Sequence, residues 1–266
     1  MRSGISTACL YPMHLEQALS TLIEFEFHIF EVFINTSSEL KPDYLRTLKQ
    51  MTEESGSCVK SIHPFTSGFE SFLLFSDYER RFCDGLEFYK HYFHAANLLE
   101  ASILVLHGQR NDKRSRITEN EYFEHYARLF ELGKSFGVTV AQENVNLFRS
   151  DDPDFIRRMR NYLGDECAFV LDVKQAVRGG EDPYEMCAAM GERLVHVHIN
   201  DNKPGHDCLL PGSGTMDFDA LKRIMLEHGY SGDLIIEVYR RDFDKLQELV
   251  HAKRVVESLI GYDNCI

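Results

Sequence analysis

Residues 194–204 read LVHVHINDNKP, and this stretch decides how the rest of the chain is interpreted. Apolar residues alternate with His196 and His198 at every second position, which is the side-chain period of a β-strand. The run then enters a polar cluster at residues 200–202, which is typical of a loop. A strand that is apolar enough to be buried therefore carries imidazoles and ends in polar side chains.

The rest of the chain repeats one pattern, in which a short β-rich run is followed by an amphipathic helical run. Asp152-Pro153 and Asp182-Pro183 are typical helix starts, while Gly137 and Gly229 fall where helices end. Strands are predicted at residues 4–10, 28–35, 58–65, 101–108, 138–145, 167–175, 194–201 and 233–239. Helices are predicted at residues 14–24, 43–54, 77–98, 119–136, 152–162, 183–190, 217–228 and about 244–258.

Eight alternating strand–helix pairs predict an α/β fold, a single (β/α)8 TIM barrel. The chain has 266 residues, 44% of them hydrophobic, and no linker, so we expect one domain over residues 1–266. The alternative is an open doubly wound sheet, which usually has a glycine-rich phosphate loop after its first strand. Residues 8–14, ACLYPMH, do not form such a loop. The loop over residues 201–215 is long enough to suggest a functional lid or wall.

Charge and composition restrict the partners. The net charge is −13 and the sequence pI is about 5.4, and such an acidic chain is unsuited to non-specific binding of nucleic acid. The sequence has no apolar run of about 18 residues and no signal-peptide core, so we expect no membrane span. The seven cysteines include no CxxC pair. Free thiols in a reducing environment are the natural reading, and a cytoplasmic location is expected.

Six consecutive predicted strands end in an imidazole or a carboxylate. In a TIM barrel the carboxyl ends of the strands meet at one rim, where the reactive groups of this fold lie. We therefore expect these side chains to converge. They are His63, His107, Glu143, Asp172, His198 and Glu237.

Three converging carboxylates would repel one another, and burying such charges without partners costs several kcal/mol each, as an order of magnitude. A divalent cation removes both problems. The predicted ligands are Glu143, Asp172, His198 and Glu237, a set of oxygens and one nitrogen that suits Mn²⁺, Zn²⁺, Co²⁺ or Mg²⁺. His196 points the same way as His198 but one layer deeper, and we expect it to be a core or supporting histidine.

Other polar residues near the rim are candidates for contacts to a substrate. His63 and His107 stay open between a second metal and substrate hydroxyls. Lys174 is two residues from Asp172, so on a strand it would share that face and aim at the pocket or lie at the rim. The remaining substrate-binding or orienting candidates are Gln175, Asn144, Asn146, Asp201 and His206, and Arg110, Arg149 and Lys203 are further candidates for a phosphate.

Seven segments of the chain resemble, in the family's order, the xylose-isomerase-like TIM-barrel superfamily. This superfamily includes sugar (phosphate) isomerases and epimerases, ketose 3-epimerases, inosose dehydratases and the endonuclease IV family. The resemblance implies that Glu143, Asp172, His198 and Glu237 are the shared metal ligands. It also implies that His63 and His107 match positions that hold an additional zinc in the endonuclease branch, with Glu143 bridging. The segments are SIHPF, LVLHG, AQENVN, FVLDVKQA, HVHINDNK, LLPGSGTMDF and LIIEVY.

The chain also departs from the family's patterns. Gln175 stands where members commonly have histidine in an Asp-x-x-His motif on strand 6, and His206-Asp207-Cys208 replaces the Asp-x-His of the endonuclease branch. A complete trinuclear zinc site is therefore not expected, and Cys208 is read as a packed loop thiol. The ketose 3-epimerase branch contacts substrate through that histidine and an arginine, which here are Gln175 and the Lys203-Pro204 pair.

These residues predict a metal-dependent isomerase or epimerase of a sugar, sugar phosphate or cyclitol. A dication would stabilise an enediolate, and Glu143 and Glu237 would remove and return the proton from opposite faces. One alternative is an endonuclease IV-type phosphodiesterase, favoured by His63 and His107. Others are an inosose-type dehydratase and a non-catalytic sugar-binding barrel. Related barrels often pair, so a homo-oligomer stays open.

Overall fold

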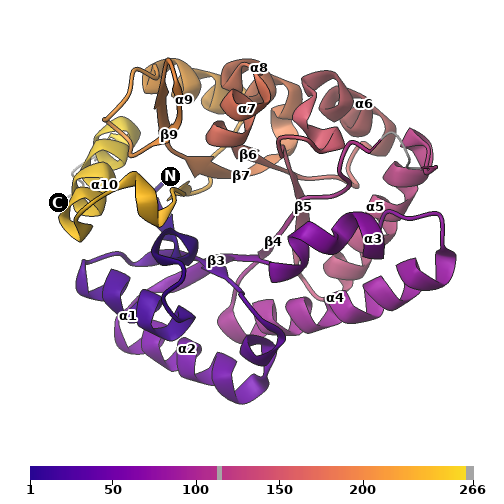
Figure 1. Ribbon diagram of the computed structural model, residues 1–266, viewed down its shortest axis with the longest axis horizontal. Helices are drawn as coiled ribbons and strands as arrows, with labels where there is room; N and C mark the ends of the chain where they lie inside the picture. The colour runs from indigo at the N-terminus through magenta and orange to yellow at the C-terminus, as the bar shows by residue number, and fades with distance from the viewer. Residues whose placement is uncertain (113–115, 262–266) are drawn as a thin grey trace.

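A closed barrel of parallel strands forms the centre of the computed structural model, which describes residues 1–112 and 116–261 (Figure 1). Around the barrel the strand order is β1-β10-β7-β6-β5-β4-β3-β2, so the first and last strands close it. This confirms the predicted TIM barrel and excludes the open sheet. The strands are β1 Ser3–Ser6, β2 Ile29–Phe33, β3 Cys58–His63, β4 Ile103–Leu106, β5 Thr139–Glu143, β6 Phe169–Asp172, β7 Leu194–Ile199 and β10 Leu234–Ile236.

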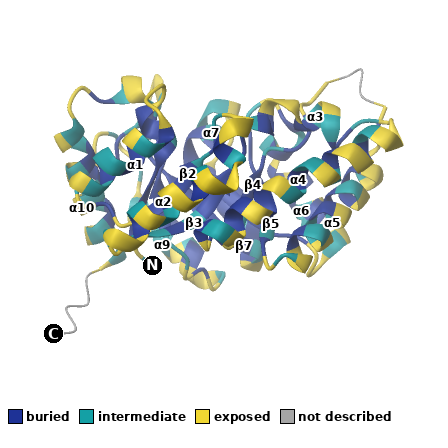
Figure 2. Ribbon diagram, turned by 90° about the horizontal axis from the view of Figure 1, so that it is seen from below, coloured by how far each residue is buried: buried dark blue, intermediate teal, exposed yellow. Residues whose placement is uncertain are grey.

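Helices surround the strands and bury their apolar faces against them, while their outer faces are exposed (Figure 2). Each of the eight predicted helices is present. Asp152 and Asp182 cap their helices as expected, accepting hydrogen bonds from the backbone N–H of Asp154 and Tyr184. Within the described residues, none of the helices combines the length and the apolarity needed to cross a membrane. The eight are α1 Leu15–Glu24, α2 Pro42–Glu54, α4 Glu79–Leu99, α5 Glu119–Ser135, α6 Pro153–Leu163, α8 Pro183–Met190, α9 Phe218–Glu227 and α10 Leu246–Ile260.

One predicted strand ends earlier than expected, and this changes the position of a candidate residue. β6 stops at Asp172, and a further helix, α7 Val173–Gly179, begins at the next residue. The Asp172 carboxylate accepts a hydrogen bond from Gln175 N at 3.1 Å, so it caps this helix. The prediction that Lys174 shares a strand face with Asp172 is therefore wrong, because Lys174 lies in the first turn of α7.

Two other segments also differ from the prediction. The first strand ends at Ser6, and residues 7–10 form a 3₁₀ turn, η1 Thr7–Leu10, in place of the predicted continuation of the strand. A short helix that the sequence did not reveal, α3 Glu70–Leu73, lies between β3 and α4. Both segments follow the carboxyl end of a barrel strand, where loops of this fold build the active face.

The long loop after β7 is a folded hairpin rather than an open lid. Its antiparallel strands are β8 Asp201–Lys203 and β9 His206–Leu209. The buried Asp201 carboxylate accepts hydrogen bonds from Gly212 N at 3.0 Å, Gly214 N at 2.8 Å and Met216 N at 3.1 Å. These contacts hold the loop in its folded form, and the contact of Asp201 with a ligand or substrate stays a prediction.

The described cysteines are free, which agrees with the expected reduced thiols. Cys208 is 7% exposed and packs in the apolar core, as a packed loop thiol would. Burial also raises its pKa, so the reactive thiolate form is disfavoured. Cys265 lies outside the described residues.

Candidate metal centre

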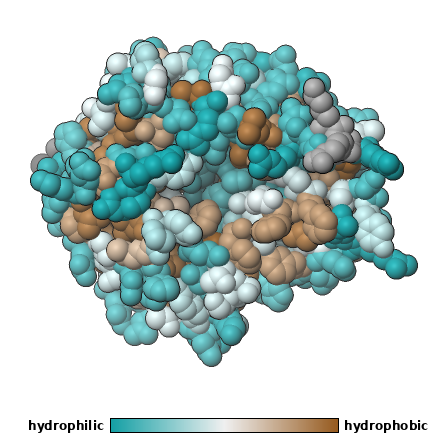
Figure 3. All heavy atoms as spheres, viewed as in Figure 1, coloured by the Kyte–Doolittle hydropathy of each residue, from teal (hydrophilic) through white to brown (hydrophobic). Residues whose placement is uncertain are grey.

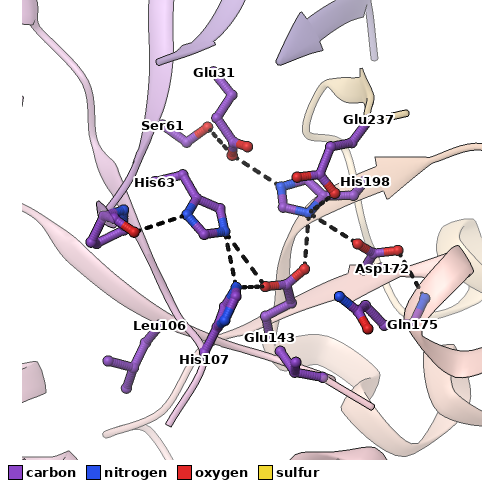
Figure 4. A network of polar contacts seen from close by, with 12 residues as sticks. Glu31, Ser61, His63, Leu106, His107, Glu143, Asp172, Gln175, His198 and Glu237 are labelled. Atoms are coloured by element: carbon purple, nitrogen blue, oxygen red, sulfur yellow. Dashed lines mark hydrogen bonds and ion pairs between the residues drawn. The ribbon is translucent and has the colours of Figure 1, made fainter. Parts of the chain in front are cut away.

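Four neighbouring strands of the barrel bring the four predicted metal ligands together. Glu143 and Asp172 end β5 and β6, His198 lies in β7, and Glu237 directly follows β10. The strand register pairs Asp172 with His198, and Glu237 N donates to the Ile199 carbonyl at 3.2 Å. The four side chains are buried and point toward one another (Figure 4). The rule that strand ends meet at one rim therefore predicted this cluster correctly.

The arrangement within the cluster suits a cation. His198 Nδ1 lies 3.2 Å from Glu143 Oε1, 3.4 Å from Glu237 Oε2 and 3.7 Å from Asp172 Oδ2. One ligand atom from each of the four residues lies within 4.8 Å of the others. Ligands at about 2.0–2.2 Å from one ion can be up to about 4.4 Å apart, so the spacing of these four atoms is close to that of a coordination shell. Carboxylate oxygens and one imidazole form a donor set that fits a divalent cation.

The carboxylates of the cluster differ in their proton affinity. Burial raises the pKa of Glu237 to about 7, although Lys174 and His198 act in the opposite direction. Burial also acts to raise the pKa of Glu143, but the imidazoles of His107 and His198 overcome it and hold this pKa well below its usual range. The neighbours of these two carboxylates thus shift their pKa values in opposite directions. Acid–base catalysis uses such pairs, because one group can act as the base while the other acts as the acid.

His63 and His107 form a second group on the other side of Glu143. Their Nε2 atoms are 3.0 Å apart, and His107 Nε2 lies 2.9 Å from Glu143 Oε2. His63 Nε2 is 3.8 Å from the same oxygen. Glu143 therefore presents one oxygen to His198 and the other to this histidine pair (Figure 4). The geometry is compatible with both predicted roles of the pair, a second metal or contacts to substrate hydroxyls.

A buried carboxylate behind His198 was missed in the sequence. Glu31 lies in β2, and its Oε2 is 3.0 Å from His198 Nε2, 3.1 Å from His196 Nε2 and 2.8 Å from the hydroxyl of Ser61. One nitrogen of His198 thus faces Glu31 and the other faces the carboxylate cluster. A metal-ligating histidine commonly donates its second N–H to such a carboxylate, which fixes the tautomer. His196 is buried beside it, as expected of a supporting histidine.

Replacing Glu31 with glutamine is expected to weaken binding of Mn²⁺ by about 10–100-fold, the range found for partners of metal ligands. The amide can present an N–H₂ to His198 Nε2, which disfavours the tautomer that leaves Nδ1 free to ligate. Isothermal titration of the metal-free protein measures the effect. Ser61→Ala is the matched control, because Ser61 touches Glu31 and His196 without contacting His198. Equal affinities for the Glu31→Gln variant and the wild type would contradict this role.

Lys174 is buried inside the cluster rather than placed at the rim. Its ammonium donates hydrogen bonds to Asp172 Oδ2 and Glu237 Oε2. These carboxylates raise its pKa well above the usual range, although burial acts to lower it. The expectation that this lysine aims into the pocket agrees with its position, but the partners it finds are carboxylates of the protein.

The other substrate-binding candidates lie at different depths. The side chain of Asn144 is hydrogen-bonded to the backbone of Asp172. Its Oδ1 accepts from the N–H of Asp172 at 2.7 Å, and its Nδ2 donates to the Asp172 carbonyl at 3.0 Å. Gln175 is half-buried, and its side chain accepts from Asn146 N at 3.3 Å. His206 and Lys203 are exposed on the hairpin. Asn144 therefore orients a predicted ligand, while a contact of Gln175 or His206 with substrate stays a prediction.

Glu70 of α3 is a further buried carboxyl group, and it lies near the histidine pair. Its Oε1 accepts from the Tyr89 hydroxyl at 2.7 Å, and its Oε2 accepts from the backbone N–H of Gly108, the residue after His107. Burial raises the pKa of Glu70 to about 8, so near neutral pH it is mostly protonated. This residue fixes α3 to the end of β4 and supports the loop that carries His107.

Glu70 makes the stability of the fold depend on pH. Because its folded-state pKa of about 8 lies above the ordinary value of 4.5, its contribution is fully present below pH 4.5 and is lost as the pH rises to about 8. The Glu70→Gln variant lacks this titration. Its free energy of unfolding should therefore rise relative to wild type across that window, by a few kcal/mol in order of magnitude. Urea denaturation at several pH values measures the difference, and a difference that stays constant with pH would contradict the assignment.

The cluster opens narrowly to solvent at the carboxyl ends of the strands. The side chains of His107 and Glu237 are 18% and 11% exposed, whereas those of His63, Glu143, Asp172 and His198 are exposed by 3% or less. The space-filling view of this face shows a hollow near its centre (Figure 3). Of these six side chains, those of His107 and Glu237 are the most accessible to a molecule that approaches from solvent.

Comparison with known proteins gives a consistent match. The family model described as Xylose isomerase-like TIM barrel matches residues 20–259. A D-tagatose 3-epimerase-like protein superposes with a TM-score of 0.80 at 19% identity and covers 98% of this chain and 97% of its own. D-psicose 3-epimerase from Clostridium cellulolyticum H10, solved with D-tagatose, gives 0.77 at 14% identity, and IolI protein, solved with a zinc atom, gives 0.78 at 16%. Both alignments cover 98% of each chain. At these identities the likeness shows the fold alone.

Curated relatives match over shorter stretches. The inosose dehydratase of Clostridium botulinum (strain Eklund 17B / Type B) is 26% identical over 168 residues, which cover 56% of this chain and 49% of that protein. The chain spans about half the length of the curated relatives it matches over such stretches.

Proposed function

The chain belongs to the xylose isomerase-like TIM barrel family, and from this membership together with its site we propose a metal-dependent isomerase or epimerase of a sugar, sugar phosphate or cyclitol. One observation carries the proposal. Glu143, Asp172 and Glu237 each direct a carboxylate oxygen to within 3.7 Å of His198 Nδ1, so that β5, β6, β7 and β10, four neighbouring strands of one barrel, meet at this point. The names of solved relatives that are epimerases, and of one that holds zinc, support the same reading.

A divalent cation bound by these four residues would supply Lewis acidity, which polarises a substrate carbonyl and its neighbouring hydroxyl and acidifies the adjoining C–H bond. The side chains of the protein then carry the proton. Glu143 and Glu237 come from β5 and from the end of β10, which β6 and β7 separate in the barrel. Their carboxylates thus approach the site from different sides, and one can remove a proton while the other returns it. Asp172 and His198 would mainly hold the metal.

A substrate screen tests this function. The metal-free protein is loaded with Mn²⁺ or Co²⁺ and incubated in D₂O with ketoses, aldoses, their phosphates and inosose. The expected result is deuterium at one carbon next to a carbonyl, together with an epimer or isomer of that substrate. Metal-loaded, folded protein that incorporates deuterium into none of these compounds would contradict the proposal.

A dehydratase is a variant of the same chemistry, in which proton removal is followed by loss of a hydroxyl. The inosose dehydratase relative favours this variant. The two outcomes are separated by the product, since a dehydratase yields a compound lighter by one water. Mass spectrometry of the products of the same screen therefore distinguishes them.

A phosphodiesterase of the endonuclease IV type is the second candidate, because His63, His107 and Glu143 form another potential metal-binding group beside the first. Paired metals about 3.5–4 Å apart suit phosphoryl chemistry. The net charge of −13 argues against a DNA substrate. Salt-sensitive binding and cleavage of abasic duplex DNA would favour this candidate over the first.

A further inference from the structure

The four-residue site already contains a cation of the protein itself. Lys174 is only 2% exposed, and its ammonium lies between two of the four predicted ligands, Asp172 and Glu237. A buried lysine needs such partners, because an unpaired ammonium in the interior is costly. The carboxylates need it equally, since they would otherwise face one another in a largely buried space.

The ammonium is bonded to the two carboxylate oxygens that face the histidine of the site. Lys174 donates to Asp172 Oδ2 and Glu237 Oε2, and these two atoms are also the ones that face His198 Nδ1, at 3.7 and 3.4 Å. The other Asp172 oxygen is occupied, because Oδ1 accepts from Gln175 N as the cap of α7. A dication that approached His198 Nδ1 would therefore meet two oxygens that are already bonded to a positive charge.

We propose that Lys174 is a built-in counter-ion of the metal site, and that a divalent cation must displace its ammonium from Asp172 and Glu237 in order to bind. This inference rests on the metal site of the proposed function. It adds that metal binding is an exchange of one cation for another. The site is consequently stable without metal and binds metal more weakly than its four ligands alone would.

An aromatic ring beside the ammonium is a partner that the displaced lysine could keep. Lys174 Nζ lies 5.7 Å from the centre of the Tyr239 ring, which is within the range of a cation–π contact. Tyr239 follows Glu237 by two residues, at the open end of the site. A lysine that leaves the carboxylates for this ring would stay beside the pocket, where an oxygen of a substrate could accept its hydrogen bond.

The test compares Mn²⁺ binding by metal-free wild type and the Lys174→Met variant, which keeps most of the side-chain volume and removes the charge. We expect the variant to bind Mn²⁺ at least tenfold more tightly in isothermal titration. We also expect its melting temperature to be lower than that of wild type without metal and to rise more when Mn²⁺ is added, because a ligand that binds more tightly stabilises the folded state more at the same concentration. Lys222→Met is the matched control, since Lys222 bonds the carbonyls of Leu259 and Ile260 away from the site.

The outcomes separate this inference from the proposed function. Equal or weaker Mn²⁺ binding by Lys174→Met would overturn the inference while leaving the metal site in place, and so would an equal gain in affinity by Lys222→Met. If neither wild type nor Lys174→Met binds Mn²⁺, both the inference and the proposed function fail.

A crystal structure of the wild-type protein with Mn²⁺ keeps the inference testable if the variant does not fold. The expected result is that Lys174 Nζ has moved beyond hydrogen-bond distance of Asp172 Oδ2 or Glu237 Oε2. An ion ligated by all four residues, with Nζ still bonded to both oxygens, would overturn the inference.

Discussion

Replacing Glu143 or Glu237 with glutamine is expected to abolish the exchange of a carbon-bound substrate hydrogen with solvent. Glutamine keeps the shape of each side chain but cannot accept or return a proton, and a positioned acid or base contributes about 10²–10⁴-fold to such a step. Deuterium uptake from D₂O, followed by NMR at saturating Mn²⁺, measures the loss. Saturation matters because both residues are also predicted metal ligands.

Glu39→Gln provides the matched control for this experiment. Glu39 is another buried glutamate, and its carboxylate accepts a hydrogen bond from Asn35 N at 2.6 Å, outside the cluster of predicted ligands. This variant should exchange at the wild-type rate. If Glu143→Gln or Glu237→Gln also exchanges at that rate, the assignment of these two residues as acid and base is wrong.

Replacing Asp172 with asparagine is expected to lower the affinity for Mn²⁺ by at least about 100-fold, more than the loss of a partner that only supports a ligand. The amide retains an oxygen to cap α7, so the helix start is preserved while one negative charge of the site is removed. Isothermal titration or the EPR signal of free Mn²⁺ measures the change. Catalysis should fall in parallel when the metal is not saturating.

Asp182→Asn is the corresponding control. Asp182 caps α8 as Asp172 caps α7, since it accepts from Tyr184 N at 2.9 Å, but it is exposed and is not part of the cluster. Its variant should bind Mn²⁺ like wild type. Wild-type affinity in Asp172→Asn would show that this carboxylate is not a ligand.

The barrel could be predicted from sequence because its signals are local and repeated. Strand and helix periods alternate along the chain, and caps such as Asp152 and Asp182 mark where helices begin. The convergence of Glu143, Asp172 and His198 followed from the same reading, since parallel strands of a barrel end at one rim. Neither inference required knowledge of a distant contact.

What sequence reasoning missed or misplaced depends on contacts that no local pattern encodes. Glu31 lies in an apolar strand run, and its importance follows from its approach to His198, 167 residues away. Lys174 was misplaced because the Asp172 side chain caps a helix where a strand was expected to continue. No local pattern encodes the hydrogen bonds that the Asp201 carboxylate accepts from backbone amides 11 to 15 residues later.

Anomalous diffraction from a crystal grown with excess Mn²⁺ tests the central claim most directly. The account predicts one strong manganese peak bounded by Glu143, Asp172, His198 and Glu237, with coordination distances to all four side chains. The same four side chains surrounding only solvent, with no manganese peak between them, would contradict it.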